Sequence, residues 1–213
     1  MKKKLLEILI IVAILVLGLY GVKKIVSKLE INILPKSNLQ INYDHEWDNI
    51  SEDDEKIIKK AILLAREKVK MEYVWGGKGE IMTEERLAEL IEYYGEKQYP
   101  LDDKQYIGKQ AFDCSGLTYW IYRESSGVNI GYSTTQQKEI LEKYKVKGDL
   151  QPGDLIYTPG HVVIYIGDGK IIQSKNKFEY PTGGIHEQGI GWYITGEAYR
   201  PIDYINDQKS IQK

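Results

Sequence analysis

The side chains best suited to covalent chemistry are a single cysteine and a histidine far downstream. Cys114 is the only cysteine in 213 residues, and it begins a predicted helix between Asp113 and Ser115. The first turn of a helix presents backbone N–H groups that favour a thiolate. His161 begins a predicted strand after a Pro-Gly turn, where its imidazole could face a helix packed across the sheet edge. A thiol with an imidazole base predicts nucleophilic catalysis.

A third polar residue, Gln173, follows His161 across the turn at residues 167–169. Antiparallel pairing would place the two side chains opposite each other, or nearly so, on one face of the sheet. Gln173 would then accept the Nδ1–H of the imidazole and leave Nε2 for the thiol. The competing interpretation is structural, because a free cysteine is often a buried hydrophobe. A lone histidine or glutamine on a strand is also more often packed or exposed than catalytic.

Composition excludes several other classes of protein. A hydrophobic content of 42% rules out a disordered chain, and a net charge of −2 argues against nucleic-acid binding, which usually shows a basic surplus. One cysteine excludes an internal disulfide framework and a four-cysteine zinc site. The other two histidines, His45 and His186, are expected to be solvated, the second in a glycine-rich loop. We therefore expect no metal and no cofactor.

Residues 5–22 are apolar except for Glu7. Eighteen helical residues span roughly 27 Å, close to the hydrocarbon core of about 30 Å. The three lysines at positions 2–4 mark the cytoplasmic end. We therefore expect residues 1–24 to be an uncleaved, single-pass membrane anchor, with residues 25–50 as an extracytoplasmic spacer. A cleaved signal peptide and a buried core helix are the alternatives.

The elements that must position Cys114 and His161 fall into two groups. Ser51 and Asp54 resemble a capping box, and apolar residues behind them recur at helical spacing to about Met71. Further helices are expected over 83–94, 114–125 and 134–144, with a polar loop over 96–111. Beyond Gly148 the sequence predicts strands over 154–158, 161–166, 170–174 and 192–200, joined by glycine-containing turns. Helices followed by an antiparallel sheet predict an α+β fold.

Four blocks of sequence, in order, resemble the NlpC/P60 family of cell-wall peptidases. They are Tyr73-Val74-Trp75-Gly76-Gly77, Phe112-Asp113-Cys114-Ser115-Gly116-Leu117, Gly153-Asp154-Leu155-Ile156 and the segment from His161 to Gly167. The resemblance covers residues 56–202. It implies a papain-like α+β fold, with N-terminal helices packed on an antiparallel sheet.

The resemblance also implies a cysteine peptidase that cleaves peptidoglycan stem peptides, usually at the γ-D-glutamyl bond to the diamino acid. Cys114 would be the nucleophile and His161 the base, with Gln173 in a third position where histidine is commonest and Asn or Gln also occur. Tyr73 corresponds to a tyrosine whose hydroxyl lies beside the nucleophile. Asp113 and Ser115 match positions that, in members acting on released peptides, bind the free amine of the stem.

The resulting domain plan has a catalytic domain over 51–205 and a tail over 206–213. An insert of 34 residues, 78–111, stands where many family members have only a handful. It is either a lid or specificity wall beside the active site, or a surface insertion without a role. Two other functions remain open. One is a wall amidase or acyltransferase that uses the same thiol chemistry, and the other is a non-catalytic wall-binding module.

Overall fold

The computed structural model describes residues 38–177 and 179–211. The expected membrane segment, residues 5–22, and the first half of the expected spacer lie outside the described residues. In the described part of the chain, no helix combines the length and the apolar character needed to cross a bilayer.

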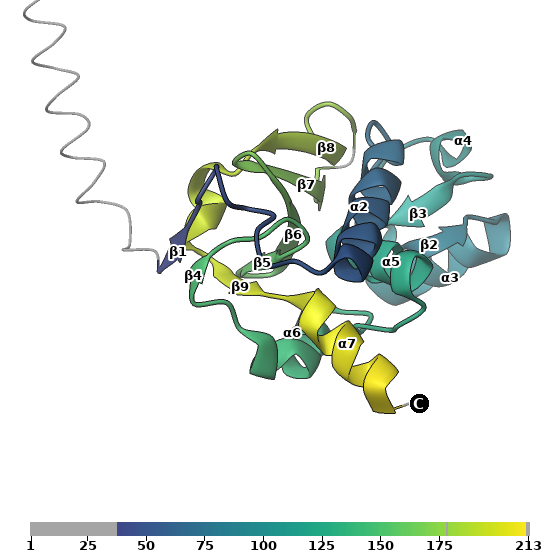
Figure 1. The fold of residues 1–213 in the computed structure, drawn as a ribbon. Helices are drawn as coiled ribbons and strands as arrows, with labels where there is room; N and C mark the ends of the chain where they lie inside the picture. The colour runs from purple at the N-terminus through teal and green to yellow at the C-terminus, as the bar shows by residue number, and fades with distance from the viewer. Residues whose placement is uncertain (1–37, 178, 212–213) are drawn as a thin grey trace, which may run out of the picture. The chain divides into compact units, whose positions relative to one another are not determined.

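The centre of the fold is a five-stranded antiparallel sheet with strand order β8-β7-β6-β5-β9 (Figure 1). The three central strands form the expected meander through tight glycine-containing turns. The region 192–200 is only partly strand, because a 3₁₀ helix, η3, precedes β9. Strand β8 was not predicted. The bounds are β5 Leu155–Thr158, β6 His161–Gly167, β7 Lys170–Lys175, β8 Gly184–Gly189, η3 Gly191–Thr195 and β9 Glu197–Tyr199.

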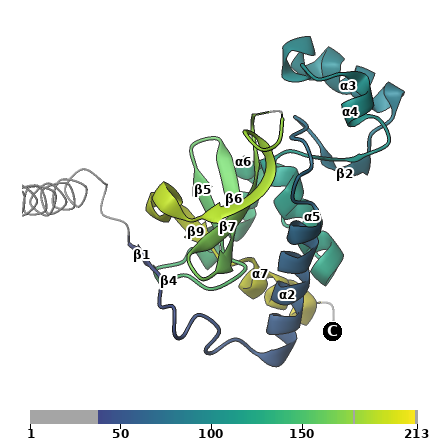
Figure 2. The ribbon, with the colours of Figure 1, turned by 90° about the horizontal axis from the view of Figure 1, so that it is seen from above.

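Two helices, α2 (Glu52–Glu67) and α5 (Cys114–Ser126), lie side by side against one face of this sheet (Figures 1 and 2). The cap at Ser51 is confirmed, since its hydroxyl accepts from the backbone N–H of Asp54, although the helix ends at Glu67 rather than near Met71. Helix α5 ends at Gly127, whose φ of 79° is left-handed and favours glycine. The α+β class with helices on an antiparallel sheet is therefore confirmed.

Alternation along the strands separates two cores. Val162 and Ile164 of β6 pack with Cys114 in the core under α2 and α5. Val163 and Tyr165 point the other way, into a second core covered in part by Leu39 and by Tyr193 of η3. Both faces of the sheet are thus buried, which explains why β6 is an almost continuous apolar run.

The insert forms a small layer with its own core. Strands β2 and β3 pair antiparallel, and the helices between them stand apart from the main sheet in Figure 2. The expected loop over 96–111 is wrong in part, because Asp102 and Gln105 form a capping box that starts a helical turn, and Tyr99 and Tyr106 are buried. The elements are β2 Lys78–Ile81, α3 Glu84–Tyr94, η1 Glu96–Gln98, α4 Asp103–Tyr106 and β3 Gln110–Phe112.

Residues 38–50 are not a spacer. Strand β1 (Leu39–Gln40) pairs in parallel with β4 (Gly148–Asp149). The carboxylate of Glu46 is 4% exposed and accepts from the Tyr165 hydroxyl and, at 2.8 Å, from the backbone N–H of Asp168. This buried acid ties the segment to the β6–β7 turn, so residues 38–50 are part of the folded domain.

The C-terminal end also differs from expectation. Helix α7 (Pro201–Ile211) passes through the expected boundary between residues 205 and 206, so the tail is helical as far as Ile211. Ile202 and Ile205 pack into the core beneath α2. The expected helix over 134–144 divides into α6 (Thr134–Leu141) and a 3₁₀ turn, η2 (Glu142–Tyr144).

Candidate active site

Cys114 is the first residue of α5 and is only 8% exposed. Burial, together with the nearby charge of Asp113, raises the pKa of its thiol to about 11. The backbone N–H groups of Val162 and Ser115 and the ammonium of Lys78 act in the opposite direction. The helix start alone therefore does not produce a thiolate, contrary to expectation, and the thiol needs a base at neutral pH.

The carboxylate of Asp113 is fully engaged by its surroundings. Its Oδ1 atom accepts from the backbone N–H of Gly116 at 2.6 Å and from the Ser115 hydroxyl at 3.0 Å. Its Oδ2 atom lies 2.5 Å from Nζ of Lys78 and accepts from the backbone N–H of Gly76 at 3.2 Å. Lys78 also donates to Ser115 at 3.1 Å. The two side chains expected to bind a substrate amine thus hold the ammonium of the chain's own lysine.

His161 begins β6, and the thiol of Cys114 is close to the backbone N–H of the next residue, Val162. The Nε2 atom of His161 lies 2.7 Å from Oε1 of Gln173. An amide oxygen can only accept, so this nitrogen carries the proton and Nδ1 has the lone pair. The expected hydrogen bond is confirmed, but the expected nitrogen is wrong, because β7 approaches the imidazole from the Nε2 side.

Burial lowers the pKa of His161, and the electrostatic effects of Lys175 and His186 lower it further, while the bond to Gln173 opposes them. The imidazole is therefore neutral at neutral pH, which is the form that can accept a proton from a thiol.

Gln173 is 1% exposed and makes three side-chain hydrogen bonds. Besides His161, its Oε1 accepts from the Tyr193 hydroxyl at 2.7 Å. Its Nε2 lies 3.1 Å from Nε2 of His186, its register partner on β8. His186 is therefore a strand residue beside the site, not a solvated loop residue. Sequence reasoning missed both neighbours, since their approach depends on a non-local strand pairing and on η3.

Tyr73 lies beside the cysteine, as the sequence suggested. Its side chain is 3% exposed, and its ring meets that of Trp75 edge-on with centroids 6.1 Å apart. Burial raises the pKa of Tyr73 well above its ordinary value, and the charges of Cys114 and Asp113 raise it further. The phenol thus remains protonated and able to donate near the thiol.

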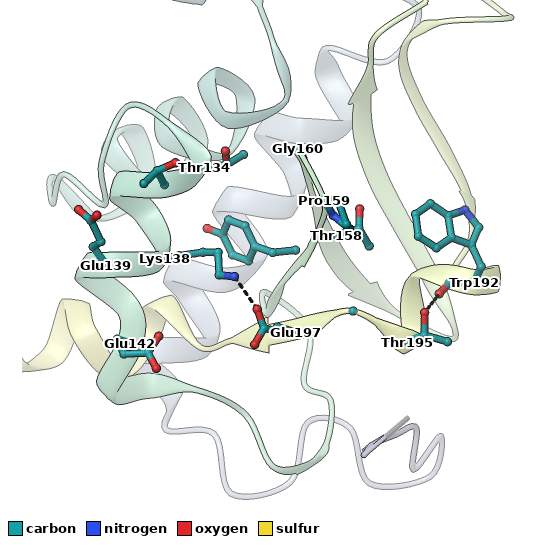
Figure 3. Close-up of a pocket in the computed structure, with 13 residues that line it drawn as sticks. Thr134, Lys138, Glu139, Glu142, Thr158, Pro159, Gly160, Trp192, Thr195 and Glu197 are labelled. Atoms are coloured by element: carbon teal, nitrogen blue, oxygen red, sulfur yellow. Dashed lines mark hydrogen bonds and ion pairs between the residues drawn. The ribbon is translucent and has the colours of Figure 1, made fainter. Parts of the chain in front are cut away.

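A groove of about 790 Å³ opens next to these residues between α6, the end of β5 and η3 (Figure 3). Tyr157 and Gly160 line it, and Gly160 directly precedes His161. Trp192, which is 55% exposed, stands at one side, and Lys138 and Glu197, which form an ion pair 2.5 Å long, are part of the lining. The groove has the size and the mixed lining of a ligand site.

Within the described residues, no group of three or more His, Cys, Asp or Glu side chains is arranged to hold a metal ion.

Curated proteins similar to this chain carry the names of endopeptidases and of a hydrolase. A probable endopeptidase p60 from Listeria seeligeri is 33% identical over 42% of this chain and 17% of its own length. Murein DD-endopeptidase MepH from Escherichia coli is 31% identical over 31% of this chain and 27% of its own length. Gamma-DL-glutamyl hydrolase from Bacillus subtilis is 32% identical over 30% of this chain and 17% of its own length. The chain thus matches less than a third of each of these relatives.

Two solved structures are similar to this chain at low sequence identity. The peptidoglycan hydrolase RipB from Mycobacterium tuberculosis is 21% identical, covers 73% of this chain and 70% of its own, and has a TM-score of 0.49. The NlpC/p60 domain of the peptidoglycan hydrolase SagA is 22% identical over 67% of this chain and 97% of its own, with a TM-score of 0.41. The model of the NlpC/P60 family matches residues 70–190, more than half of the sequence. The chain belongs to the NlpC/P60 family.

Proposed function

We propose that this chain is a cysteine endopeptidase that hydrolyses peptide bonds in peptidoglycan stem peptides. The observation that supports it most is the arrangement at the start of β6. A cysteine at a helix start lies near the Val162 backbone, and the adjacent imidazole is held through Nε2 by Gln173 at 2.7 Å. The names of the family relatives support the same reaction class.

In the first step, Nδ1 of the neutral His161 takes the proton from the Cys114 thiol as the sulfur attacks the carbonyl carbon. The resulting oxyanion accepts hydrogen bonds from the backbone N–H of Cys114, one of the N–H groups at a helix start that lack a helical partner. The Tyr73 hydroxyl supplies a second donor. Gln173 does not contact the substrate; it orients the base and partly stabilises the imidazolium.

In the second step, the imidazolium of His161 gives its proton to the leaving amine as the C–N bond breaks, which leaves a thioester on Cys114. Water then loses a proton to His161 and attacks the thioester. Collapse of this intermediate releases the carboxylic acid and returns the proton to the sulfur. The thiol, the imidazole and water are therefore sufficient to supply and accept every proton that these steps transfer.

Lys78 supports a substrate in which the stem is still attached to its glycan. Asp113 and Ser115 already bind the ammonium of Lys78, at 2.5 and 3.1 Å. A substrate ammonium at the same place would be repelled by the positive charge of Lys78. We therefore propose that Asp113 and Ser115 position the start of α5, rather than bind a free stem amine. The groove along Tyr157 and Trp192 would receive one side of the stem.

The bond cut is proposed as γ-D-glutamyl to diamino acid. We propose that the insert forms a wall beside the nucleophile, because the Tyr99 hydroxyl donates to the carbonyl of Trp75 at 2.9 Å and Tyr94 packs edge-on against Trp75.

We also propose that residues 5–22 anchor the chain in the cell membrane with the domain outside, on the basis of their apolar character and the lysines at 2–4. Protease digestion of intact and permeabilised cells tests this location.

The deciding experiment is digestion of purified peptidoglycan by the full chain, with the products identified by mass spectrometry. We expect fragments with new γ-D-glutamyl carboxyl ends, and no products from the Cys114→Ala chain. Release of intact stems from the sugar would instead identify a wall amidase. Cleavage at another peptide bond would keep the peptidase and change the bond. Binding without any product from the native chain would identify a non-catalytic wall-binding module and overturn the proposal.

A further inference from the structure

Gln173 presents a problem that a carboxylate would not have. The two ends of its side-chain amide are nearly identical in shape, but only the oxygen can accept the Nε2–H of His161. If the amide turned over, its NH₂ group would face that N–H, and the imidazole would have to move its proton to Nδ1. His161 would then have no lone pair for the thiol of Cys114. The proposed mechanism therefore requires something that fixes the amide.

The hydroxyl of Tyr193 does not decide this orientation by itself. It donates to Oε1 of Gln173 at 2.7 Å, but a hydroxyl can also accept and could serve a turned amide. The other end of the amide is different. Nε2 of Gln173 lies 3.1 Å from Nε2 of His186, and Nδ1 of His186 lies 3.2 Å from the backbone carbonyl of Gly184.

The carbonyl of Gly184 can only accept, so it selects the tautomer of His186 that carries its proton on Nδ1. Nε2 of that tautomer has only a lone pair, and a lone pair must face the NH₂ end of Gln173. The other neighbour of Nε2 of His186 is Oε1 of Gln188, at 3.2 Å. This oxygen could accept a hydrogen bond only from the other tautomer, in which Nε2 carries the proton. The three strands β6, β7 and β8 thus carry one ordered sequence of hydrogen bonds.

From this arrangement we infer that His186 is a positioning residue for the peptidase, one that fixes the amide of Gln173 and through it the tautomer of His161. The inference rests on the proposed function. His186 neither touches the thiol nor exchanges protons during turnover; it selects which nitrogen of His161 is basic.

Steady-state kinetics test this inference in two forms of the protein, the native chain and a Gln173→Glu chain. His186→Ala should lower kcat about tenfold, the worth of one neutral hydrogen bond, and leave KM unchanged. Gln188→Ala, which alters the same nitrogen's surroundings without touching Gln173, is the matched control and should keep kcat. In a Gln173→Glu chain both ends of residue 173 accept, so His186→Ala should then cost nothing further. An equal loss in both backgrounds, or no loss in the native one, overturns the inference.

Imidazole ¹⁵N spectra of the full chain give an answer that does not depend on any variant. We expect His161 with its proton on Nε2 and His186 with its proton on Nδ1 at neutral pH. A proton on Nε2 of His186 overturns the inference even if the native enzyme is active. Failure of the native chain to digest peptidoglycan, with both tautomers as expected, would instead contradict the proposed function alone.

Discussion

Nε2 of His161 and Oε1 of Gln173 lie 2.7 Å apart across the β6–β7 hairpin. The bond spans a diagonal of the hairpin, since Ile164 pairs with Ile172 and Tyr165 with Ile171. Both side chains therefore project from the sheet face opposite to Val162 and Ile164. The proposed mechanism therefore requires the imidazole to approach Cys114, the first residue of α5, around the start of β6 and not through the core beneath the helix.

Replacing the nucleophile gives the simplest test of the proposed chemistry. Cys114→Ala should bring peptidoglycan hydrolysis below detection, because no other group forms the thioester. Circular dichroism and thermal unfolding should match the native chain, since the loss of one sulfur at a helix start is a small packing change. Turnover in the folded Cys114→Ala chain would remove this residue from the mechanism.

Gln173→Ala should leave measurable activity, because the amide orients the base without touching the substrate. We expect kcat to fall by about ten- to a hundredfold, with KM unchanged, in steady-state assays on muropeptides. Tyr193→Phe is the matched control, since it removes one donor to the same oxygen and keeps the bond to His161. A complete loss in Gln173→Ala would show that the amide stabilises the transition state directly.

The pH profile should follow from the burial of the proposed base. Burial lowers the pKa of His161, so kcat/KM should fall on the acid side only below about pH 6.5, the ordinary imidazole value. The same depression means that the folded state resists protonation, so this group's contribution to stability is lost as the pH falls through that range. An acid limb centred above pH 7 would contradict a buried, neutral base.

Thiol reactivity separates base activation from a preformed thiolate. Because the pKa of Cys114 is raised to about 11, the His161→Ala chain should react with iodoacetamide slowly at pH 7 and faster as the pH approaches that value. Lys78→Met should move this profile to higher pH by leaving Asp113 uncompensated, whereas Lys78→Arg keeps the charge. Identical profiles for Lys78→Met and the native lysine would exclude this electrostatic role.

A buried ion pair should matter for stability more than for catalysis. Arg200 donates from Nε and Nη2 to the two oxygens of Asp154, both at 2.9 Å, and Asp154 is 1% exposed. Arg200→Met should lower the free energy of unfolding by about 3–5 kcal/mol in urea titrations, because it leaves a buried carboxylate unpaired. Arg66→Met breaks an exposed pair with Glu187 and should cost about 1 kcal/mol or less. Equal losses in the two variants would contradict this.

Local signals in the sequence were enough to predict α2, α3 and α5, but not α4 or α7. Ser51 and Thr83 accept from the first turns they precede, and Gly127 ends α5, because caps depend on neighbours in sequence. Strand β8 could not be predicted, since its glycine-rich segment lacks alternation and exists through pairing with β7. His186 was missed for that reason.

Within the site, residue types were predictable and orientations were not. Sequence spacing suggested that Gln173 meets His161, but the nitrogen involved depends on the ring's rotation in the folded sheet. The ion pair of Asp113 with Lys78 could not be predicted either, because the two residues are 35 positions apart in the chain. Such contacts are decided by tertiary packing, not by local sequence.

The packing of residues 38–50 against the sheet limits how far the chain can be shortened at its N-terminal side. Trimming the chain to start at residue 51 would strip β4 of its partner strand and uncover Tyr165 beneath the lost Glu46. Exposed strand edges and apolar rings invite self-association. A shortened or fused chain that keeps the fold must therefore retain residues 38–50.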